Sequence, residues 1–166
     1  PDETASKLSN ALTSSPAAKT RTRRSPPLIS VMNCAVRSAM AEAMVKTRFP
    51  GQIFTDSCGV EPGQPDGFAI AVMDEIDIDL SAHQPKGFDD LDCEFYDVII
   101  SFSPEAHDRA VALTRNIDCQ TLYLPVDNLA GLRGSREERL RAYRAVRDDI
   151  IAKLAVYLPE ENAGEG

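Results

Sequence analysis

The chain has 166 residues and is acidic, because 26 Asp and Glu residues outweigh 18 Lys and Arg residues and give a formal net charge of −8. Its length predicts one folded domain, and its 43% hydrophobic share is typical of a globular protein. The acidic balance argues against non-specific binding to nucleic acid, and no apolar run is long enough to cross a membrane. We therefore expect no nucleic-acid partner and no membrane association.

The charge is uneven along the chain. Residues 1–26 carry five basic and two acidic side chains, a net of +3, which leaves −11 for the remainder. The first segment is rich in Ser, Thr, Ala and Pro, a composition that cannot bury enough apolar surface to offset its ordering entropy. We expect a disordered basic arm over 1–26, a domain over 27–158 and a flexible acidic tail over 159–166. The arm is either a solvated linker or a contact for an acidic partner.

The spacing of the cysteines predicts the cellular compartment of the protein. They are widely spaced, none belongs to a C-x-x-C pair, and the chain has only two histidines. This pattern predicts scattered thiols in a reducing compartment, hence a cytoplasmic protein, and it predicts no metal site. The four positions are Cys34, Cys58, Cys93 and Cys119.

The first half of the domain predicts strands and helices in alternation. An apolar strand over 28–32 leads into a helix over 39–48, which is rich in Ala and Met and stops at Pro50-Gly51. A second strand over 53–58 is followed by a Pro- and Gly-containing loop over 59–66. A second helix is expected over 68–75.

The second half repeats the alternation. Residues 96–102 form an apolar run that is typical of a strand covered on both faces. Ser103 and Pro104 are the expected N-cap and first residue of a third helix. A fourth strand is expected over 121–124. The last helix starts with a capping box, Ser135 with Glu138, and continues with an apolar stripe made of Leu140, Tyr143, Ile150, Leu154 and Tyr157.

This order of elements predicts the fold class. Strands joined by helical crossovers form a parallel sheet, so we expect a three-layer α/β sandwich. Its four strands should lie in the flavodoxin-like order 2-1-3-4. Ligands bind outside the carboxyl ends of such strands, and the connection after the first strand is the first candidate site.

That connection has features that suit an anion. Backbone N–H groups and the helix dipole converge at a strand-to-helix loop, and an arginine fork binds phosphate or a similar oxyanion through two hydrogen bonds. Arg37 supplies the fork, and Ser38 caps the helix or orients the loop. The predicted phosphate-binding loop consists of Val31, Met32, Asn33, Cys34, Ala35, Val36, Arg37 and Ser38.

Residues 36–43 read V-R-S-A-M-A-E-A and resemble the low-molecular-weight protein tyrosine phosphatases and their arsenate reductase relatives, in which a C-x5-R-S loop is followed by x-M-A-E. Four later stretches match in the same order, and the matches together span 28–157. The resemblance implies the type I phosphotyrosine phosphatase fold. These stretches are S-C-G-V at 57–60, I-D-I-D-L-S-A-H-Q-P at 76–85, Y-D-V-I-I at 96–100 and L-P-V-D at 124–127.

The catalytic residues of that family are only partly present. Its nucleophilic cysteine lies six residues before the arginine, where this chain has Val31, and an alternative alignment places Ser30 there. Cys34 lies only three residues before Arg37, so it is either a loop residue facing the core or an off-register reactive thiol. Asp127 matches the general acid of the family, with Asn128 in place of proline; the alternative is a turn aspartate.

These departures predict an inactive phosphatase fold, a pseudophosphatase. We expect it to bind an oxyanion, a phosphorylated ligand or a protein partner and to act in regulation. We expect it to need no cofactor. Two alternatives remain open. One is an active phosphatase or arsenate reductase that uses Cys34, although the segment near 80–90, where the reductases need further cysteines, holds only His83 and, beyond it, Cys93. The other is a purely structural interaction module.

Overall fold

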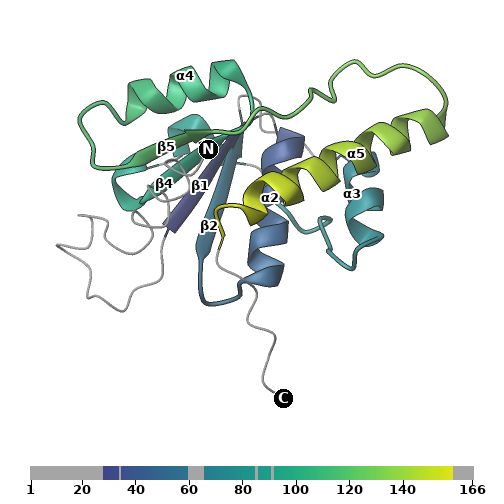
Figure 1. The fold of residues 1–166 in the computed structure, drawn as a ribbon, viewed down its shortest axis with the longest axis horizontal. Coiled ribbons are helices and arrows are strands. Elements are labelled where there is room, and N and C mark those ends of the chain that lie inside the picture. Colours follow the sequence, from purple (N-terminus) through teal and green to yellow (C-terminus); the bar gives the residue numbers. More distant parts are fainter. Residues whose placement is uncertain (1–27, 34, 60–65, 85, 91, 159–166) are drawn as a thin grey trace.

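A five-stranded parallel sheet with the order β3-β2-β1-β4-β5 forms the centre of the structure, a computed structural model (Figure 1). It describes residues 28–33, 35–59, 66–84, 86–90 and 92–158. The elements are β1 (Leu28–Asn33), α2 (Ala35–Arg48), β2 (Phe54–Gly59), α3 (Gly67–Asp74), β3 (Lys86–Gly87), β4 (Val98–Ser101), α4 (Pro104–Leu113), β5 (Gln120–Tyr123) and α5 (Arg136–Ala155), with short 3-10 turns at Phe88–Asp90 and Cys93–Phe95.

The α/β class with parallel strands is confirmed, but the predicted count of four strands was wrong. The four longer strands lie in the order β2-β1-β4-β5, and β3 adds a fifth strand beside β2 through the pairs Cys58–Lys86 and Gly59–Gly87. Two residues are too few to produce an alternating pattern, so the sequence carried no signal for β3. The expected arm over 1–26 and the tail over 159–166 lie outside the described residues.

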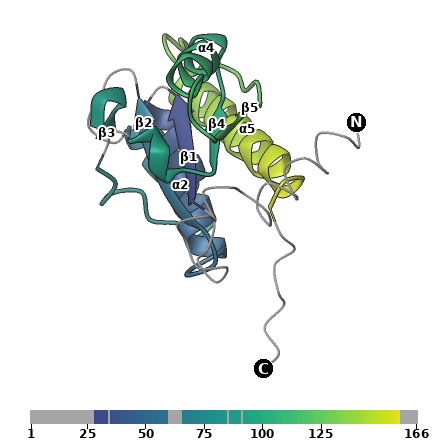
Figure 2. The same cartoon turned by 90° about the vertical axis from the view of Figure 1, so that its left-hand side faces the viewer.

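Helices cover both faces of the sheet (Figures 1 and 2). The larger core packs α2, α3 and α5 against one face, and it includes Val98 and Ile100 of β4. The smaller core holds Ile99 together with Ala106 and Ala110 of α4 on the other face. All four residues of β4 are buried, as expected for a strand covered on both sides. Among the described helices, none is both long and apolar enough to span a membrane.

Capping interactions fix where the helices begin. Ser103 accepts a hydrogen bond from the Ala106 amide at 3.2 Å and Pro104 starts α4, which confirms the predicted cap. The predicted capping box of α5 is also present, because Ser135 Oγ accepts from the Glu138 amide and Glu138 Oε2 accepts from the Ser135 amide. The cap of α3 is Asp66, which the sequence analysis placed in a loop.

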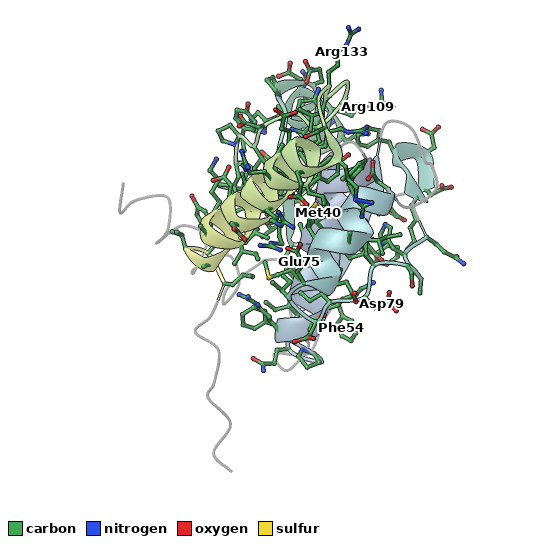
Figure 3. The ribbon with its side chains drawn as sticks, turned by 90° about the vertical axis from the view of Figure 1, so that its right-hand side faces the viewer. Met40, Phe54, Glu75, Asp79, Arg109 and Arg133 are labelled. Carbon is green, nitrogen blue, oxygen red and sulfur yellow. The ribbon has the colours of Figure 1, made fainter. Side chains whose placement is uncertain are left out.

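An ion-pair network joins α3 to α5 where α3 ends (Figure 3). Glu75 accepts hydrogen bonds from Arg144 at 2.8 Å and from Arg147 at 2.9 Å. Arg147, which is 9% exposed, also donates to the Val72 carbonyl at 2.6 Å. These contacts hold α3 and α5 side by side, and residues of both helices line one of the clefts described below.

Asp77 follows α3 with a backbone φ of 60°, and it is the one non-glycine residue with positive φ among those described. Only glycine adopts this left-handed conformation without steric cost. Asp77→Gly is therefore expected to raise the free energy of unfolding by about 0.5–1 kcal/mol in chemical denaturation. As a control, Asp74→Gly at the end of α3 is expected to lower it. A lower stability of the Asp77→Gly protein would contradict the prediction.

Candidate functional site

The junction between β1 and α2 differs from the loop that the sequence predicted. Val31 pairs with Ser57 of β2 and Ile100 of β4, and β1 continues until Asn33 pairs with Gly59. Because α2 begins at Ala35, a single residue separates strand from helix. The predicted phosphate-binding loop is thus a strand-to-helix junction, and phosphate binding by it stays a prediction. Its first three residues complete hydrogen-bond ladders in the sheet, and its last four form the first turn of α2: Ala35, Val36, Arg37 and Ser38. Cys34 lies outside the described residues.

Arg37 is buried in this first turn, with 4% of its surface exposed. Its Nη1 donates hydrogen bonds to the carbonyl oxygens of Val126 at 2.6 Å and Asp127 at 3.2 Å. The guanidinium thus ties the start of α2 to the segment after β5. Arg37 therefore lies beside residue 127, and the acceptors at these two distances are backbone carbonyls. Binding of an oxyanion by Arg37 stays a prediction.

Asp127 lies at the carboxyl edge of the sheet, in the segment that follows β5, and it is exposed between the buried residues Val126 and Leu129. The next residue, Asn128, accepts a hydrogen bond from the Ala130 amide at 3.0 Å through its side chain, which is an Asx turn. Asp127 is thus placed near Arg37 through its main chain, while its side chain is exposed. A role as general acid stays a prediction.

A cleft of about 340 Å³ opens next to the first turn of α2. Asp66 lines this cleft, and both of its carboxylate oxygens accept hydrogen bonds. Oδ1 caps α3 by accepting from the Phe68 amide at 2.8 Å, and Oδ2 accepts from the Tyr143 hydroxyl at 2.9 Å. The Phe68 and Tyr143 rings pack at 5.4 Å. The cleft is lined by Val36, Asp66, Phe68, Leu129, Ala130, Gly131, Leu132, Arg139 and Tyr143.

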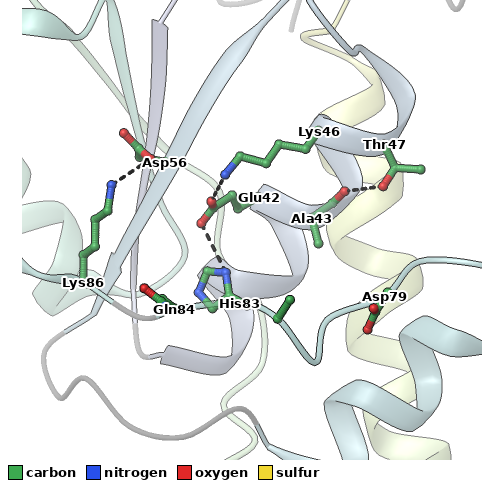
Figure 4. Close-up of a pocket in the computed structure, with 10 residues that line it drawn as sticks. Glu42, Ala43, Lys46, Thr47, Asp56, Asp79, His83, Gln84 and Lys86 are labelled. Carbon is green, nitrogen blue, oxygen red and sulfur yellow. Dashed lines mark hydrogen bonds and ion pairs between the residues drawn. The ribbon is translucent and has the colours of Figure 1, made fainter.

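A second cavity, of about 420 Å³, lies further along α2, around the carboxylate of Glu42 (Figure 4). Glu42 is 7% exposed and accepts hydrogen bonds from Lys46 and from the Ser57 hydroxyl. His83 Nδ1 is 3.5 Å from Glu42 Oε2, and His83 Nε2 is 3.4 Å from Ser57 Oγ. Glu42, Ser57 and His83 belong to three separate motifs of the sequence, and no pattern in the sequence predicted that they meet.

His83 is expected to make the stability of the protein depend on pH. Burial lowers its pKa below the ordinary value of 6.5, the nearby Glu42 opposes this shift, and Lys46 and Lys86 add to it. The folded state therefore favours neutral His83. As pH falls below 6.5, the unfolded chain takes up a proton that the folded chain does not, and stability is lost until the lower folded pKa is passed.

We therefore expect the free energy of unfolding to fall between pH 7 and pH 5 by less in His83→Gln than in the natural chain. Denaturation curves of both proteins at several pH values measure this difference. Because both proteins contain the other titrating groups, the contributions of those groups cancel in the comparison. An equal fall in both proteins would contradict the inferred lowering of the His83 pKa.

Comparison with known proteins identifies the family. A sequence model of the family described as low molecular weight phosphotyrosine protein phosphatase matches residues 28–161, most of the chain. The chain belongs to this family. A glutaredoxin arsenate reductase of Synechocystis sp. (strain ATCC 27184 / PCC 6803 / Kazusa) is 40% identical over 65 residues, which are 39% of this chain and 50% of that protein. The chain thus spans about half the length of this curated relative.

Solved structures agree on the family fold. An arsenate reductase in the reduced state is 26% identical, with a TM-score of 0.61 over 78% of this chain and 94% of that one. A tyrosine phosphatase of Erwinia amylovora is 17% identical, with a TM-score of 0.65 over 80% of this chain and 91% of that one. The flavodoxin-like fold of low-molecular-weight phosphatases is therefore confirmed.

The described cysteines are poor candidates for the thiol chemistry of this family. Burial is the main cause that raises the pKa of both Cys58 and Cys119 to about 12, and it also raises the pKa of Cys93. Thiols with such pKa values are protonated at neutral pH and unreactive. Among the described residues, no group of three or more His, Cys, Asp and Glu side chains is arranged to hold a metal ion.

Proposed function

We propose that this chain is a catalytically inactive member of its family, whose remaining role is to bind an oxyanion or a phosphorylated group and so to regulate a partner. One observation carries the inactive part: the position six residues before Arg37 is Val31, which is paired on both sides within β1. A valine side chain offers no nucleophile to phosphorus or arsenic.

The backbone supports the same proposal. Acyl and phosphoryl transfer depend on N–H groups that converge on the charge of the transition state. In β1, the N–H groups near Val31 lie within ladders to β2 and β4, and Arg37 already donates to two carbonyl groups. A catalytic centre at this position would therefore lack its nucleophile and the N–H groups of β1 that the sheet occupies.

The binding part rests on what remains at the carboxyl edge of the sheet. The first turn of α2 places helix N–H groups and the positive end of the helix dipole there, beside the Arg37 guanidinium. Such a site attracts a phosphate, an arsenate or a phosphorylated side chain of a protein partner. It needs no cofactor.

The decisive experiment measures turnover by the natural chain and by Cys34→Ser. We expect no hydrolysis of p-nitrophenyl phosphate, and no reduction of arsenate when glutathione and a glutaredoxin supply the electrons. The Synechocystis relative is the positive control for the second assay. The likeness to that protein favours one second candidate function, which is arsenate reduction with Cys34 as the attacking thiol. Arsenate reduction by the natural chain that is lost in Cys34→Ser would establish this second function in place of the first.

Restoring the family cysteine is expected not to restore activity. Val31→Cys places a thiol inside β1, where the neighbouring N–H groups serve the sheet and do not converge on a bound oxyanion. Aryl phosphate hydrolysis by this variant should stay at the level of the natural chain. Turnover well above that level would show that the cradle forms when a nucleophile is present.

Binding is tested separately by NMR titration with phosphate and with arsenate. Amide signals of residues 35–38 should shift at millimolar anion in the natural chain, and Arg37→Lys, which keeps the charge but loses the fork, should bind about tenfold more weakly. If the natural chain shows no shift at tens of millimolar anion, the oxyanion part of the proposal is wrong and an interaction module is the better description.

A further inference from the structure

Arg139 of α5 carries a guanidinium that no acceptor among the described residues binds. Within the described residues its side chain forms no hydrogen bond or ion pair, and its Nε is buried without an acceptor. Its guanidinium lies 4.8 Å from the centre of the Phe68 ring, a cation–π contact that fixes its position. By contrast, Arg144 and Arg147 on the same helix are both bound to Glu75. A half-buried guanidinium without an acceptor costs free energy that a bound anion recovers.

Arg139 lines the 340 Å³ cleft beside the first turn of α2. The walls next to it are mostly apolar and include Val36, Leu129 and Leu132. Asp66, the acidic residue of the cleft, accepts hydrogen bonds from the first turn of α3 and from the Tyr143 hydroxyl, and neither of its oxygens is bound to Arg139. The cleft therefore offers one anion-binding group at an apolar cavity whose volume is at the small end of known ligand sites.

The charges of the cleft select the kind of anion. One guanidinium and one carboxylate line it, so a ligand with a single negative charge is attracted to Arg139 and meets less repulsion from Asp66 than a dianionic phosphoryl group does. A carboxylate matches the planar edge of a guanidinium through two parallel hydrogen bonds. The apolar walls suit a flat or branched hydrocarbon body of a few carbons.

We propose that this cleft binds a small organic monocarboxylate with an aromatic or branched body, with its carboxylate on Arg139 and its body against Val36, Leu129 and Leu132. This site differs from the oxyanion seat proposed at Arg37 in its anion-binding residue, Arg139, and in its ligand, although Val36 adjoins both. The two proposals are therefore tested by different ligands and different variants, and either can fail while the other stands.

The test is an NMR titration of the natural chain with benzoate, benzamide and phenyl phosphate. Benzoate should give saturable shifts of the Leu132 and Tyr143 amides, which lie outside the proposed oxyanion seat, at millimolar concentration. Benzamide, which has the same shape without the charge, should bind at least about tenfold more weakly. Equal binding of benzoate and benzamide, no binding of benzoate, or tighter binding of phenyl phosphate at these residues would overturn the proposal.

Two variants locate the effect. Arg139→Gln should weaken benzoate binding at least about tenfold. Arg133→Gln is the matched control, because Arg133 is exposed (Figure 3) and does not line the cleft, and it should bind benzoate like the natural chain. Unchanged binding by Arg139→Gln would overturn the proposal. The benzoate–benzamide comparison uses the unaltered protein, so it decides the question even if the Arg139 variant does not fold.

Discussion

Replacing Arg37 with methionine is expected to lower the free energy of unfolding by about 1.5–3 kcal/mol. The guanidinium is 4% exposed and donates to the carbonyl oxygens of Val126 and Asp127. Methionine fills a similar volume but donates no hydrogen bond, so both carbonyls lose a charged partner at a buried position. Chemical denaturation measures the loss.

The sign of this effect separates two roles for Arg37. If Arg37 served only to bind an anion, its buried charge would have no acceptor in the ligand-free protein. Removing such an arginine leaves the free energy of unfolding unchanged or raises it. Arg133→Met is the control on an exposed arginine and should change stability by less than about 0.5 kcal/mol. A stable Arg37→Met protein would show that the carbonyl contacts contribute little and that Arg37 serves a ligand.

Leu154→Ala is expected to cost about 2–5 kcal/mol, the largest effect of a single substitution considered for this chain. Leu154 is fully buried near the end of α5, in the core between that helix and the sheet. Truncation to alanine leaves a cavity that the surrounding side chains fill only in part. Thermal and chemical denaturation should both show the loss.

The control for Leu154 lies two residues further along the chain. Val156 is 63% exposed, so Val156→Ala removes almost no buried surface and should shift stability by less than about 0.5 kcal/mol. Similar losses in both variants would mean that the end of α5 does not pack as described.

Local signals predicted most of the fold. The apolar run of β4, the Ser103 cap and the Ser135–Glu138 capping box each depend on residues within a few positions of one another, and all three are present. The motif matches predicted the family because they occur in the right order along nearly the whole domain.

The site was harder to predict because it depends on long-range pairing. Whether Val31 belongs to a loop or to a strand is decided by β2 and β4, which lie about 26 and 69 positions away along the chain. The cap of α3 depends on Asp66, whose second oxygen is held by Tyr143, a residue of α5. The pairing of Glu42 with Ser57 and the position of Arg139 over Phe68 likewise join separate elements. No pattern within one segment encodes such contacts.

The two-residue strand β3 also governs how copies of this chain meet one another. A long, flat edge strand offers a row of unpaired backbone groups on which a second sheet can grow. Here the β2 side of the sheet ends in a strand of only two residues, and its Lys86 forms an ion pair with Asp56 at 3.0 Å on that border. A charged border this short is a poor template for strand addition, so self-association through this edge of the sheet is discouraged.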